Sequence, residues 1–359
     1  MSPKKFIISG GGTGGHVYPA IAIANALKDS NSANEILFIG AKGKMEMDKV
    51  PQAGFPIKGL WISGIQRKLT LKNLMFPIKL IVSLINTLMI IKKFNPDVVI
   101  GVGGFASGPT LRVAAMLKIP IVIQEQNSYP GITNRVLSNR AEKICVAYPG
   151  LEKFFPKDKI VLTGNPVRKD ILKLSDKKQE AYSYFGLNSN KKTLLVVGGS
   201  LGARSINLGI EKYLKGLLAL DIQILWQTGK SYSIPETLPD GVKAMTFIEK
   251  MDLGYAIADF VVSRAGALAV SEIALVKIPA VLVPYPYASE DHQTKNAMSL
   301  VDGDAAILLP DDKVGDYLLK EIEDLVKDES KSNNIKQNIE KYGFPGSSNR
   351  IAKEILDLL

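Results

Sequence analysis

The sequence has little of what disulfide or metal chemistry requires. Cys145 is the only cysteine, and His16 and His292 are the only histidines, among 359 residues. One cysteine excludes an intrachain disulfide and a thiolate cluster, and two histidines without an H-E-x-x-H pattern are too few for a histidine-rich metal site. Residues 143–147 around Cys145 predict a buried strand thiol, which fits a reducing compartment. We therefore expect no metal site and no required cofactor.

Long apolar runs are also missing. The chain passes from Met1–Lys5 directly into the apolar segment Phe6–Ser9, which leaves no room for a signal peptide. The apolar run Leu80–Ile91 is shorter than the ~20 residues needed to cross a bilayer. The sequence predicts a protein that is neither exported nor membrane-spanning.

Acidic residues are fewer than basic ones. Lys and Arg number 45 against 35 Asp and Glu, a net charge of +10. This excess favours an anionic partner, which leaves nucleic acid, phospholipid headgroups and a phosphorylated substrate as classes. No basic stripe is interleaved with aromatics, so we expect no nucleic-acid partner.

Short β-branched runs alternate with helical patterns along the whole chain, which indicates α/β architecture with doubly wound parallel sheets. Two segments, 6–27 and 194–214, each read as a buried strand, a glycine-rich turn and a helix, so two Rossmann-like domains facing a cleft are predicted. The turn Gly164–Arg168 and the polar stretch 175–180 place the boundary between domains 1–164 and 165–346. A last helix at 347–359 is able to pack back on the first domain. The expected strands are Lys5–Ser9, Glu35–Ile39, Asp97–Gly101, Ile119–Ile123, Thr193–Val197, Ile222–Trp226, Phe260–Ser263 and Ala280–Val283.

Glycine-rich turns follow several of these strands. The first, Gly10–Gly15, leads into a helix whose free N–H groups attract phosphate, which predicts an anion cradle. Gly10, Gly12 and Gly15 also match G-x-G-x-x-G, but the second strand ends Phe38–Lys42 without the acid that a dinucleotide needs, and Glu46 lies beyond it. This first turn also has no G-K-[ST], so the lysine of a P-loop is absent from it. Three further turns, 101–108, 198–204 and 263–267, suit substrates that carry diphosphates; the alternative for any one turn is a simple tight connection.

Seven ordered motifs span nearly the whole chain, and together they resemble the bacterial MurG family. They are Gly11–Pro19, Gly101–Gly108, Glu125–Asn127, Gly164–Arg168, Gly198–Arg204, Arg264–Glu272 and Asp291–Asn296. The resemblance implies a GT-B glycosyltransferase that adds N-acetylglucosamine from UDP-N-acetylglucosamine to undecaprenyl-diphosphate-muramoyl-pentapeptide. It also implies a peripheral position on the cytoplasmic face of the cell membrane, with a lipid-linked acceptor and an anionic membrane surface as partners.

The resemblance also assigns roles to single residues. For the donor it implies diphosphate contacts, a uracil edge at Ile248, ribose hydrogen bonds to Glu272 and sugar contacts at Gln293 and Asn296. The full donor set is Thr13, Gly14, Gly15, Asn127, Arg168, Ser200, Ile248, Ala267, Leu268, Glu272, Gln293 and Asn296. The acceptor set is Gly103, Gly104, Glu125 and Asn134.

Several of these residues have plainer alternatives. Glu272 is otherwise a solvated surface acid, and Arg168 binds either phosphate or a nearby carboxylate. Gln293 and Asn296 are otherwise a polar pair at a helix start, although amides suit a neutral sugar. Glu125 and Asn134 orient either the acceptor or their own loop.

His16 is the candidate catalytic base. It lies at the start of the first helix, where the positive dipole end opposes protonation and favours a neutral imidazole. Such a ring can deprotonate the acceptor hydroxyl for a single inverting displacement. The alternative is a residue that only positions the acceptor or the donor phosphate.

Two other regions carry open alternatives. Residues 69–94 mix apolar side chains with lysines, which predicts either a membrane-facing patch or an ordinary amphipathic helix; the expected membrane residues are Lys72, Leu74, Met75, Phe76 and Lys79. Asp302-Gly303-Asp304 spells D-x-D, but its place after a helix favours a turn. A UDP-sugar epimerase of the same fold remains the alternative function.

Overall fold

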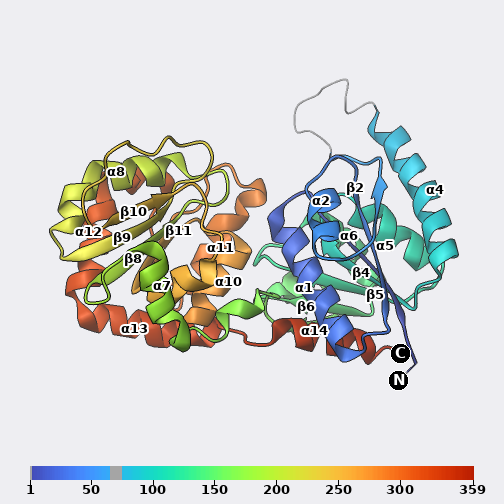
Figure 1. Ribbon diagram of the computed structural model, residues 1–359. Coiled ribbons are helices and arrows are strands. Elements are labelled where there is room, and N and C mark those ends of the chain that lie inside the picture. The colour runs from blue at the N-terminus through green and yellow to red at the C-terminus, as the bar shows by residue number, and fades with distance from the viewer. Residues whose placement is uncertain (1, 65–74) are drawn as a thin grey trace. The chain divides into compact units, whose positions relative to one another are not determined.

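The computed structural model describes residues 2–64 and 75–359. The chain forms two compact units (Figure 1). Unit 1 comprises Met1–Val167 and Gly346–Leu359, and unit 2 comprises Arg168–Pro345. The chain therefore leaves the first unit once and returns to it for its final helix.

Unit 1 is built on a seven-stranded sheet in the order β3-β2-β1-β4-β5-β6-β7. Every neighbouring pair is parallel. Strand order reverses between β1 and β4, and in open α/β sheets ligands bind outside the carboxyl ends of the strands at such a point. The strands are β1 (Lys5–Gly10), β2 (Glu35–Ala41), β3 (Ile57–Leu60), β4 (Val98–Gly103), β5 (Ile121–Glu125), β6 (Lys143–Val146) and β7 (Ile160–Leu162).

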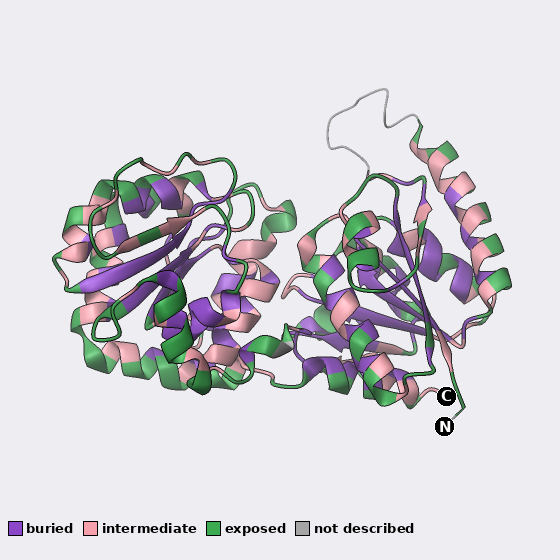
Figure 2. Ribbon diagram, in the orientation of Figure 1, coloured by how far each residue is buried: buried purple, intermediate pink, exposed green. Residues whose placement is uncertain are grey.

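Helices cover this sheet, and buried strands occupy the centre of the unit (Figure 2). The central strands β1, β4 and β5 are buried along nearly their whole length, as expected of a parallel sheet with both faces covered, whereas the edge strands β3 and β7 are only partly buried. The helices are α1 (Gly14–Ser30), α2 (Glu46–Gln52), α4 (Phe76–Phe94), α5 (Ser107–Met116), α6 (Ile132–Leu137) and α14 (Ser347–Leu356), with short 3-10 turns η1 (Ser138–Arg140), η2 (Leu151–Lys153) and η3 (Lys157–Lys159).

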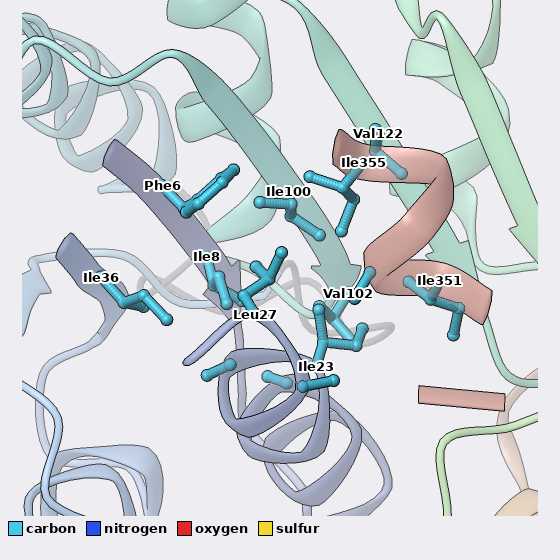
Figure 3. Packing of buried hydrophobic residues seen from close by; sticks show 14 of the residues in the cluster. Phe6, Ile8, Ile23, Leu27, Ile36, Ile100, Val102, Val122, Ile351 and Ile355 are labelled. Carbon is cyan, nitrogen blue, oxygen red and sulfur yellow. The ribbon is translucent and has the colours of Figure 1, made fainter. Parts of the chain in front are cut away.

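The C-terminal helix α14 completes the core of unit 1. Ile351 and Ile355 are fully buried and join one apolar cluster with Ile23 and Leu27 of α1 and Val102 of β4 (Figure 3). Burying one such side chain stabilises a fold by roughly 1.5–3 kcal/mol. The last residues of the chain are therefore part of the first domain's core.

Unit 2 repeats the architecture with six parallel strands in the order β10-β9-β8-β11-β12-β13. Its strand order reverses between β8 and β11. The strands are β8 (Lys192–Val197), β9 (Ile222–Gln227), β10 (Val242–Met245), β11 (Phe260–Ser263), β12 (Ala280–Leu282) and β13 (Ile307–Leu308). The two parallel sheets predicted from the sequence are confirmed.

The helices of unit 2 flank its sheet (Figure 1). Trp226 of β9 is fully buried, and its indole N–H donates to the Asn207 side chain at 3.0 Å. The α-helices are α7 (Lys178–Phe185), α8 (Arg204–Leu218), α9 (Met251–Ile257), α10 (Ala267–Val276), α11 (His292–Val301), α12 (Val314–Lys327) and α13 (Glu329–Ile339). The 3-10 turns are η4 (Lys169–Ile171), η5 (Ser175–Lys177), η6 (Ser289–Asp291), η7 (Asp311–Lys313) and η8 (Glu340–Tyr342).

Two smaller expectations are also confirmed. Cys145 is fully buried on β6, and burial raises the pKa of its thiol to about 12. Asp302–Asp304 form a turn after α11. Within residues 2–64 and 75–359, no helix combines the length and the apolar character needed to cross a bilayer.

Candidate active-site residues

The two glycine-rich turns of unit 1 pack backbone against backbone after β1 and β4. The Gly11 amide donates to the Gly103 carbonyl at 3.3 Å. A Cβ added at Gly104 would lie 2.3 Å from the Gly11 carbonyl oxygen, and Gly103 and Gly104 both have positive φ. Side chains at these positions would force the turns apart. Glycine is thus needed here for the two turns to lie in contact where the strand order reverses, between β1 and β4.

Glu46 occupies the space beneath the first turn. It is the first residue of α2 and is only 1% exposed. Its Oε2 accepts the Gly12 amide at 2.8 Å, and its Oε1 accepts the Ala41 amide at 3.0 Å. The Gly11 and Gly12 N–H groups are therefore hydrogen-bonded within the protein, and fewer N–H groups of this turn remain for the expected anion. Residues 13–15 are the part of the turn that suits an anion.

His16 lies in the first turn of α1 and is half-buried. Its Nδ1 is 3.1 Å from the Gly11 carbonyl oxygen and 3.2 Å from the Thr13 hydroxyl. A Cβ at Gly103 would lie 2.8 Å from its Nε2, so this nitrogen is beside the second glycine turn. The ring is held at one nitrogen and presents the other toward residues expected to border the acceptor.

Glu125 and Asn134 brace a loop of unit 1. Both are 2% exposed. The Glu125 carboxylate accepts the Asn134 amide at 2.8 Å, the Gly131 N–H at 3.1 Å, and both the backbone and side-chain N–H of Asn127, at 3.0 and 3.2 Å. Burial raises the pKa of Glu125, and these hydrogen bonds oppose the rise. Of the two alternatives for this pair, the contacts correspond to orienting the loop, with Asn127 as part of it.

In unit 2, the turn after β8 lies against the end of β9. A Cβ at Gly202, whose φ is positive, would lie 2.2 Å from the Thr228 carbonyl oxygen. The close approach leaves Ser200 exposed at the tip of the turn, just ahead of α8. Its place fits the expected contact with diphosphate oxygens.

Gln227, at the end of β9, ties this turn to the segment that carries Ile248. The side chain is 2% exposed. Its Oε1 accepts the Ile248 amide at 2.9 Å, and its Nε2 donates to the Gly199 carbonyl at 3.2 Å. Ile248 is itself 1% exposed, so a base at this place would meet backbone rather than side chain. Gln227 was not predicted from the sequence.

Glu272 lies on α10, in the helix that Ala267 and Leu268 begin. Its Oε2 accepts the Tyr255 hydroxyl at 3.1 Å. Burial raises the pKa of Glu272 to about 7, against the lowering effects of Arg168 and of the Tyr255 hydrogen bond. Glu272 is therefore half-buried and hydrogen-bonded to Tyr255, unlike the solvated surface acid that was the alternative prediction. Tyr255 was not identified from the sequence.

Arg168 is paired with a carboxylate. Its Nε lies 3.1 Å from the Asp170 Oδ1, and the side chain is 39% exposed. This is the second of the two pairings considered from the sequence. The guanidinium also acts electrostatically on Glu272, so the two predicted donor residues lie in one neighbourhood of unit 2.

Gln293 and Asn296 start α11 but differ in burial. The Gln293 Oε1 accepts the Tyr285 amide at 2.9 Å, which orients its side-chain N–H₂ as the remaining donor. Asn296 is fully buried, and its Nδ2 donates to the Ala265 carbonyl at 3.3 Å. Asn296 thus contacts the turn that precedes α10, whereas Gln293 is half-buried; sugar binding by the two side chains stays a prediction.

Comparison with known proteins decides the family. The glycosyltransferase family 28 N-terminal domain matches residues 6–146, and the family 28 C-terminal domain matches residues 193–351. A UDP-N-acetylglucosamine--N-acetylmuramyl-(pentapeptide) pyrophosphoryl-undecaprenol N-acetylglucosamine transferase of Flavobacterium psychrophilum is 53% identical over 100% of this chain and 99% of its own. A Cytophaga hutchinsonii protein of the same name is 49% identical, over 100% and 98%.

The crystal structure of Acinetobacter baumannii MurG covers 99% of this chain and 100% of its own, with 29% identity and a TM-score of 0.78. This chain belongs to the MurG family. It is a glycosyltransferase of GT-B fold. A UDP-N-acetylglucosamine 2-epimerase structure has a TM-score of 0.66 at 15% identity over 99% of this chain and 95% of its own, which shows the shared fold alone.

Away from the glycine turns, this MurG family member has an exposed apolar surface on helix α4. Helix α4 exposes Ile78, Ile81, Ile85 and Met89, at 50–58%, while Ser83, Thr87 and Ile91 are buried. We call these four residues, with Met75, the α4 ridge; the exposed faces of α4 are visible in Figure 2.

The other residues expected to contact the membrane are Phe76, Lys79, Lys72 and Leu74. Phe76 is half-buried, and the Lys79 ammonium donates to the Ser63 hydroxyl at 3.0 Å and sits 5.6 Å from the Trp61 ring centroid. Lys72 and Leu74 fall outside the described residues. The apolar surface of α4 is thus carried mainly by residues that follow Phe76 in the sequence.

Metal binding has no obvious ligand set in the part of the chain that the structure describes. Across residues 2–64 and 75–359, no three His, Cys, Asp or Glu side chains are placed together as a group that would hold an ion.

Proposed function

We propose that the protein transfers N-acetylglucosamine from UDP-N-acetylglucosamine to the muramoyl 4-hydroxyl of undecaprenyl-diphosphate-muramoyl-pentapeptide. The observation that carries the proposal is identity of about half the residues, over the whole chain, to proteins named for this transfer. The fold alone would not discriminate, because an epimerase shares it. The site residues described above supply the chemistry.

Unit 2 binds the donor in this proposal. The backbone N–H groups of Ala267 and Leu268, at the positive end of α10, bind the diphosphate together with the Ser200 turn. Glu272 accepts hydrogen bonds from the ribose, the Ile248 backbone meets the uracil edge, and the Gln293 amide donates to the sugar. A helix N-terminus stabilises the departing diphosphate electrostatically, so the proposed reaction needs no metal ion.

Unit 1 binds the acceptor and supplies the base. The Nε2 of His16 takes the proton of the acceptor hydroxyl as its oxygen attacks the anomeric carbon. The new carbon–oxygen bond forms with inversion, the bond from that carbon to the diphosphate oxygen breaks, and UDP leaves with its electron pair. The Thr13–Gly15 turn and the second glycine turn, which contains Gly103 and Gly104, border the reacting groups.

The α4 ridge gives this enzyme a means of reaching a lipid-linked acceptor. Exposed isoleucines and a methionine provide apolar contact with a bilayer, and Lys92 and Lys93 at the end of the helix are exposed to anionic headgroups. We place the enzyme as a peripheral protein on the cytoplasmic face of the membrane.

The test is incubation with labelled UDP-N-acetylglucosamine and a lipid-linked muramoyl acceptor in the presence of EDTA. The expected products are UDP and a lipid-linked disaccharide, formed only when the acceptor is present. Release of an isomerised free sugar nucleotide without acceptor would instead identify an epimerase. Turnover abolished by EDTA and restored by a divalent cation would contradict the metal-independent step.

The base role of His16 has its own test. His16→Ala should lower kcat by about 10²-fold or more, because general-base catalysis contributes on this scale. His292→Ala, the change at the other histidine, should lower kcat much less than His16→Ala, because His292 lies beside the proposed sugar-binding Gln293 and takes no part in the proposed proton transfer. A loss of only several-fold in His16→Ala would show that the residue positions substrate instead.

A further inference from the structure

A single peptide group joins a buried acid to the candidate base. The peptide between Gly11 and Gly12 donates its N–H to the Glu46 Oε2 at 2.8 Å. The carbonyl oxygen of the same peptide lies 3.1 Å from the His16 Nδ1. Glu46 and His16 therefore contact opposite ends of one planar, conjugated unit. This arrangement is not explained by binding of either substrate, because Glu46 is only 1% exposed.

The position of the Glu46 carboxylate is fixed by the surrounding backbone. Its second oxygen accepts the Ala41 amide, at the end of β2, at 3.0 Å. A Cβ at Gly11 would lie 2.1 Å from the Glu46 Oε1, and one at Gly40 would lie 2.5 Å from its Cγ. Glycine at both positions leaves the space that the acid fills. Since both oxygens accept backbone N–H groups, the side chain acts as a carboxylate acceptor.

The chemistry of the peptide determines what this does to His16. A carboxylate that accepts an N–H makes a strong, charge-assisted hydrogen bond, and hydrogen bonds in series polarise one another, so the carbonyl at the other end becomes a better acceptor. A carbonyl oxygen can only accept, which requires the proton on Nδ1 of His16. The ring lone pair is then on Nε2.

A second group near Nδ1 of His16, the Thr13 hydroxyl, could favour the other tautomer, so a bias toward Nδ1–H is needed. The Thr13 hydroxyl, 3.2 Å from the same nitrogen, can donate as well as accept. Donation from Thr13 would favour the tautomer with its proton on Nε2, which cannot act as a base at that atom. The nitrogen that must remain basic is the one beside Gly103, on the side expected to border the acceptor.

We propose that Glu46 is a positioning residue for the transfer reaction. Through the Gly11–Gly12 peptide it holds neutral His16 as the Nδ1–H tautomer, with the Nε2 lone pair directed at the acceptor hydroxyl. Glu46 itself touches no substrate. The inference rests on the proposed base role of His16, but its structural part, the tautomer, can be measured whether or not that role is correct.

The chain is well suited to this measurement because it has only two histidines. Long-range ¹H–¹⁵N spectra of ¹⁵N-histidine-labelled protein distinguish Nδ1–H from Nε2–H, and His292→Gln assigns the His16 signals by elimination. Neutral His16 in the wild-type protein should show the Nδ1–H pattern. An Nε2–H pattern there would overturn the proposal without any substitution in unit 1.

Glu46→Gln is the decisive variant. It keeps the size of the side chain but points an amide N–H₂ at one of the two backbone donors, and it removes the charge. We expect His16 to shift from pure Nδ1–H to a mixture of tautomers. The matched control is Glu35→Gln, an exposed acid at the start of β2 that makes the same charge change away from the peptide. An unchanged His16 tautomer in folded Glu46→Gln would refute the proposal.

Kinetics separate positioning from a general loss of structure. Glu46→Gln should lower kcat by about tenfold or more, with the KM for UDP-N-acetylglucosamine within about twofold, because the residues proposed to bind the diphosphate, ribose and uracil of the donor are on unit 2. In a His16→Ala background, Glu46→Gln should cause no further loss of kcat, because Glu46 acts only through His16. Additive losses in the double variant would contradict coupling through the peptide. Absence of transfer by the wild-type enzyme would overturn the proposed function and leave the tautomer result standing.

Discussion

Single side chains in unit 2 owe their chemistry to burial. Glu272 is held by the Tyr255 hydroxyl at 3.1 Å, and its pKa is raised to about 7 chiefly because burial disfavours its charge. The acid is therefore ionised only near and above neutral pH. This matters for donor binding, since only the carboxylate has both oxygens available to accept ribose hydroxyls.

The raised pKa makes stability depend on pH in a defined direction. Because the folded-state pKa of Glu272 lies above its value of 4.5 in a model peptide, the folded protein binds more protons between these values. Its contribution to the free energy of unfolding is full below pH 4.5 and is lost as pH rises through about 7, a change of at most ~3 kcal/mol. Chemical denaturation of the wild type and Glu272→Gln across this range should show a smaller decline in the variant.

Binding should follow the opposite trend. Calorimetry with UDP is expected to show affinity that weakens as pH falls below about 7 in the wild type, and Glu272→Gln should bind more weakly with less dependence on pH. An identical pH dependence in the two proteins would show that another group controls donor binding.

At the scale of elements, two loops of the proposed donor site are connected by a buried side-chain amide as well as by the close approach of a glycine turn. Gln227 at the end of β9 connects the Gly199 carbonyl with the Ile248 amide. Glycine allows the turn after β8 to approach β9 closely, but this side chain sets the spacing between the two segments. The turn proposed to bind phosphate and the segment proposed to meet uracil therefore depend on one buried residue.

Replacing this amide should damage both fold and site. Gln227→Leu leaves the buried Ile248 N–H without its acceptor, at a cost of about 1–3 kcal/mol, while the Gly199 carbonyl still accepts the Gly202 N–H at 3.1 Å. Thermal or denaturant unfolding should show the loss, and UDP affinity should fall. Gln337→Leu, the same change at an exposed position of α13 in unit 2, is the matched control and should be nearly neutral. Unchanged UDP affinity in Gln227→Leu would argue against a role in the site.

Helix α4 provides a second element-scale prediction. Ile81 and Ile85 of the α4 ridge are more than half exposed, so the double change Ile81→Ser and Ile85→Ser should leave stability nearly unchanged while weakening binding to anionic vesicles in a sedimentation assay. Leu208→Ser removes an exposed apolar side chain from unit 2 and should have no effect. Equal binding by the ridge variant and the wild type would remove α4 from the membrane contact.

At the scale of the whole molecule, the last helix of the sequence, α14, belongs to the core of the first unit. The chain builds unit 1, then unit 2, and ends with a helix that belongs to unit 1. Ile351 and Ile355 of α14 are fully buried against residues near the N-terminus. Unit 1 therefore gains its complete core only after α14 has been synthesised. Truncation before α14 should expose the apolar face of α1.

Ile355→Ala tests this contribution. Loss of a fully buried isoleucine side chain should destabilise unit 1 by about 2–5 kcal/mol, measured as a lower unfolding midpoint in denaturant. Leu359→Ala, at an exposed position four residues further on, is the control. A change of less than about 0.5 kcal/mol in Ile355→Ala would mean that α14 is dispensable for the core.

The sequence by itself determined the two parallel sheets, the glycine turns and the family, because these depend on local patterns. Alternating apolar runs specify strands, and glycine at fixed spacings marks close backbone approach. The helix start marked His16, and the resemblance to the MurG family implied the role of Glu272, but neither showed what surrounds these residues.

Only the tertiary structure decided which residues meet. It placed Glu46 beneath the first turn, Tyr255 on Glu272, Gln227 between two loops, and the Asn296 side chain on the Ala265 carbonyl. The physical reason is that a buried polar group must find its hydrogen-bond partner across elements distant in sequence. That pairing depends on how strands and helices pack, and no local spacing encodes it.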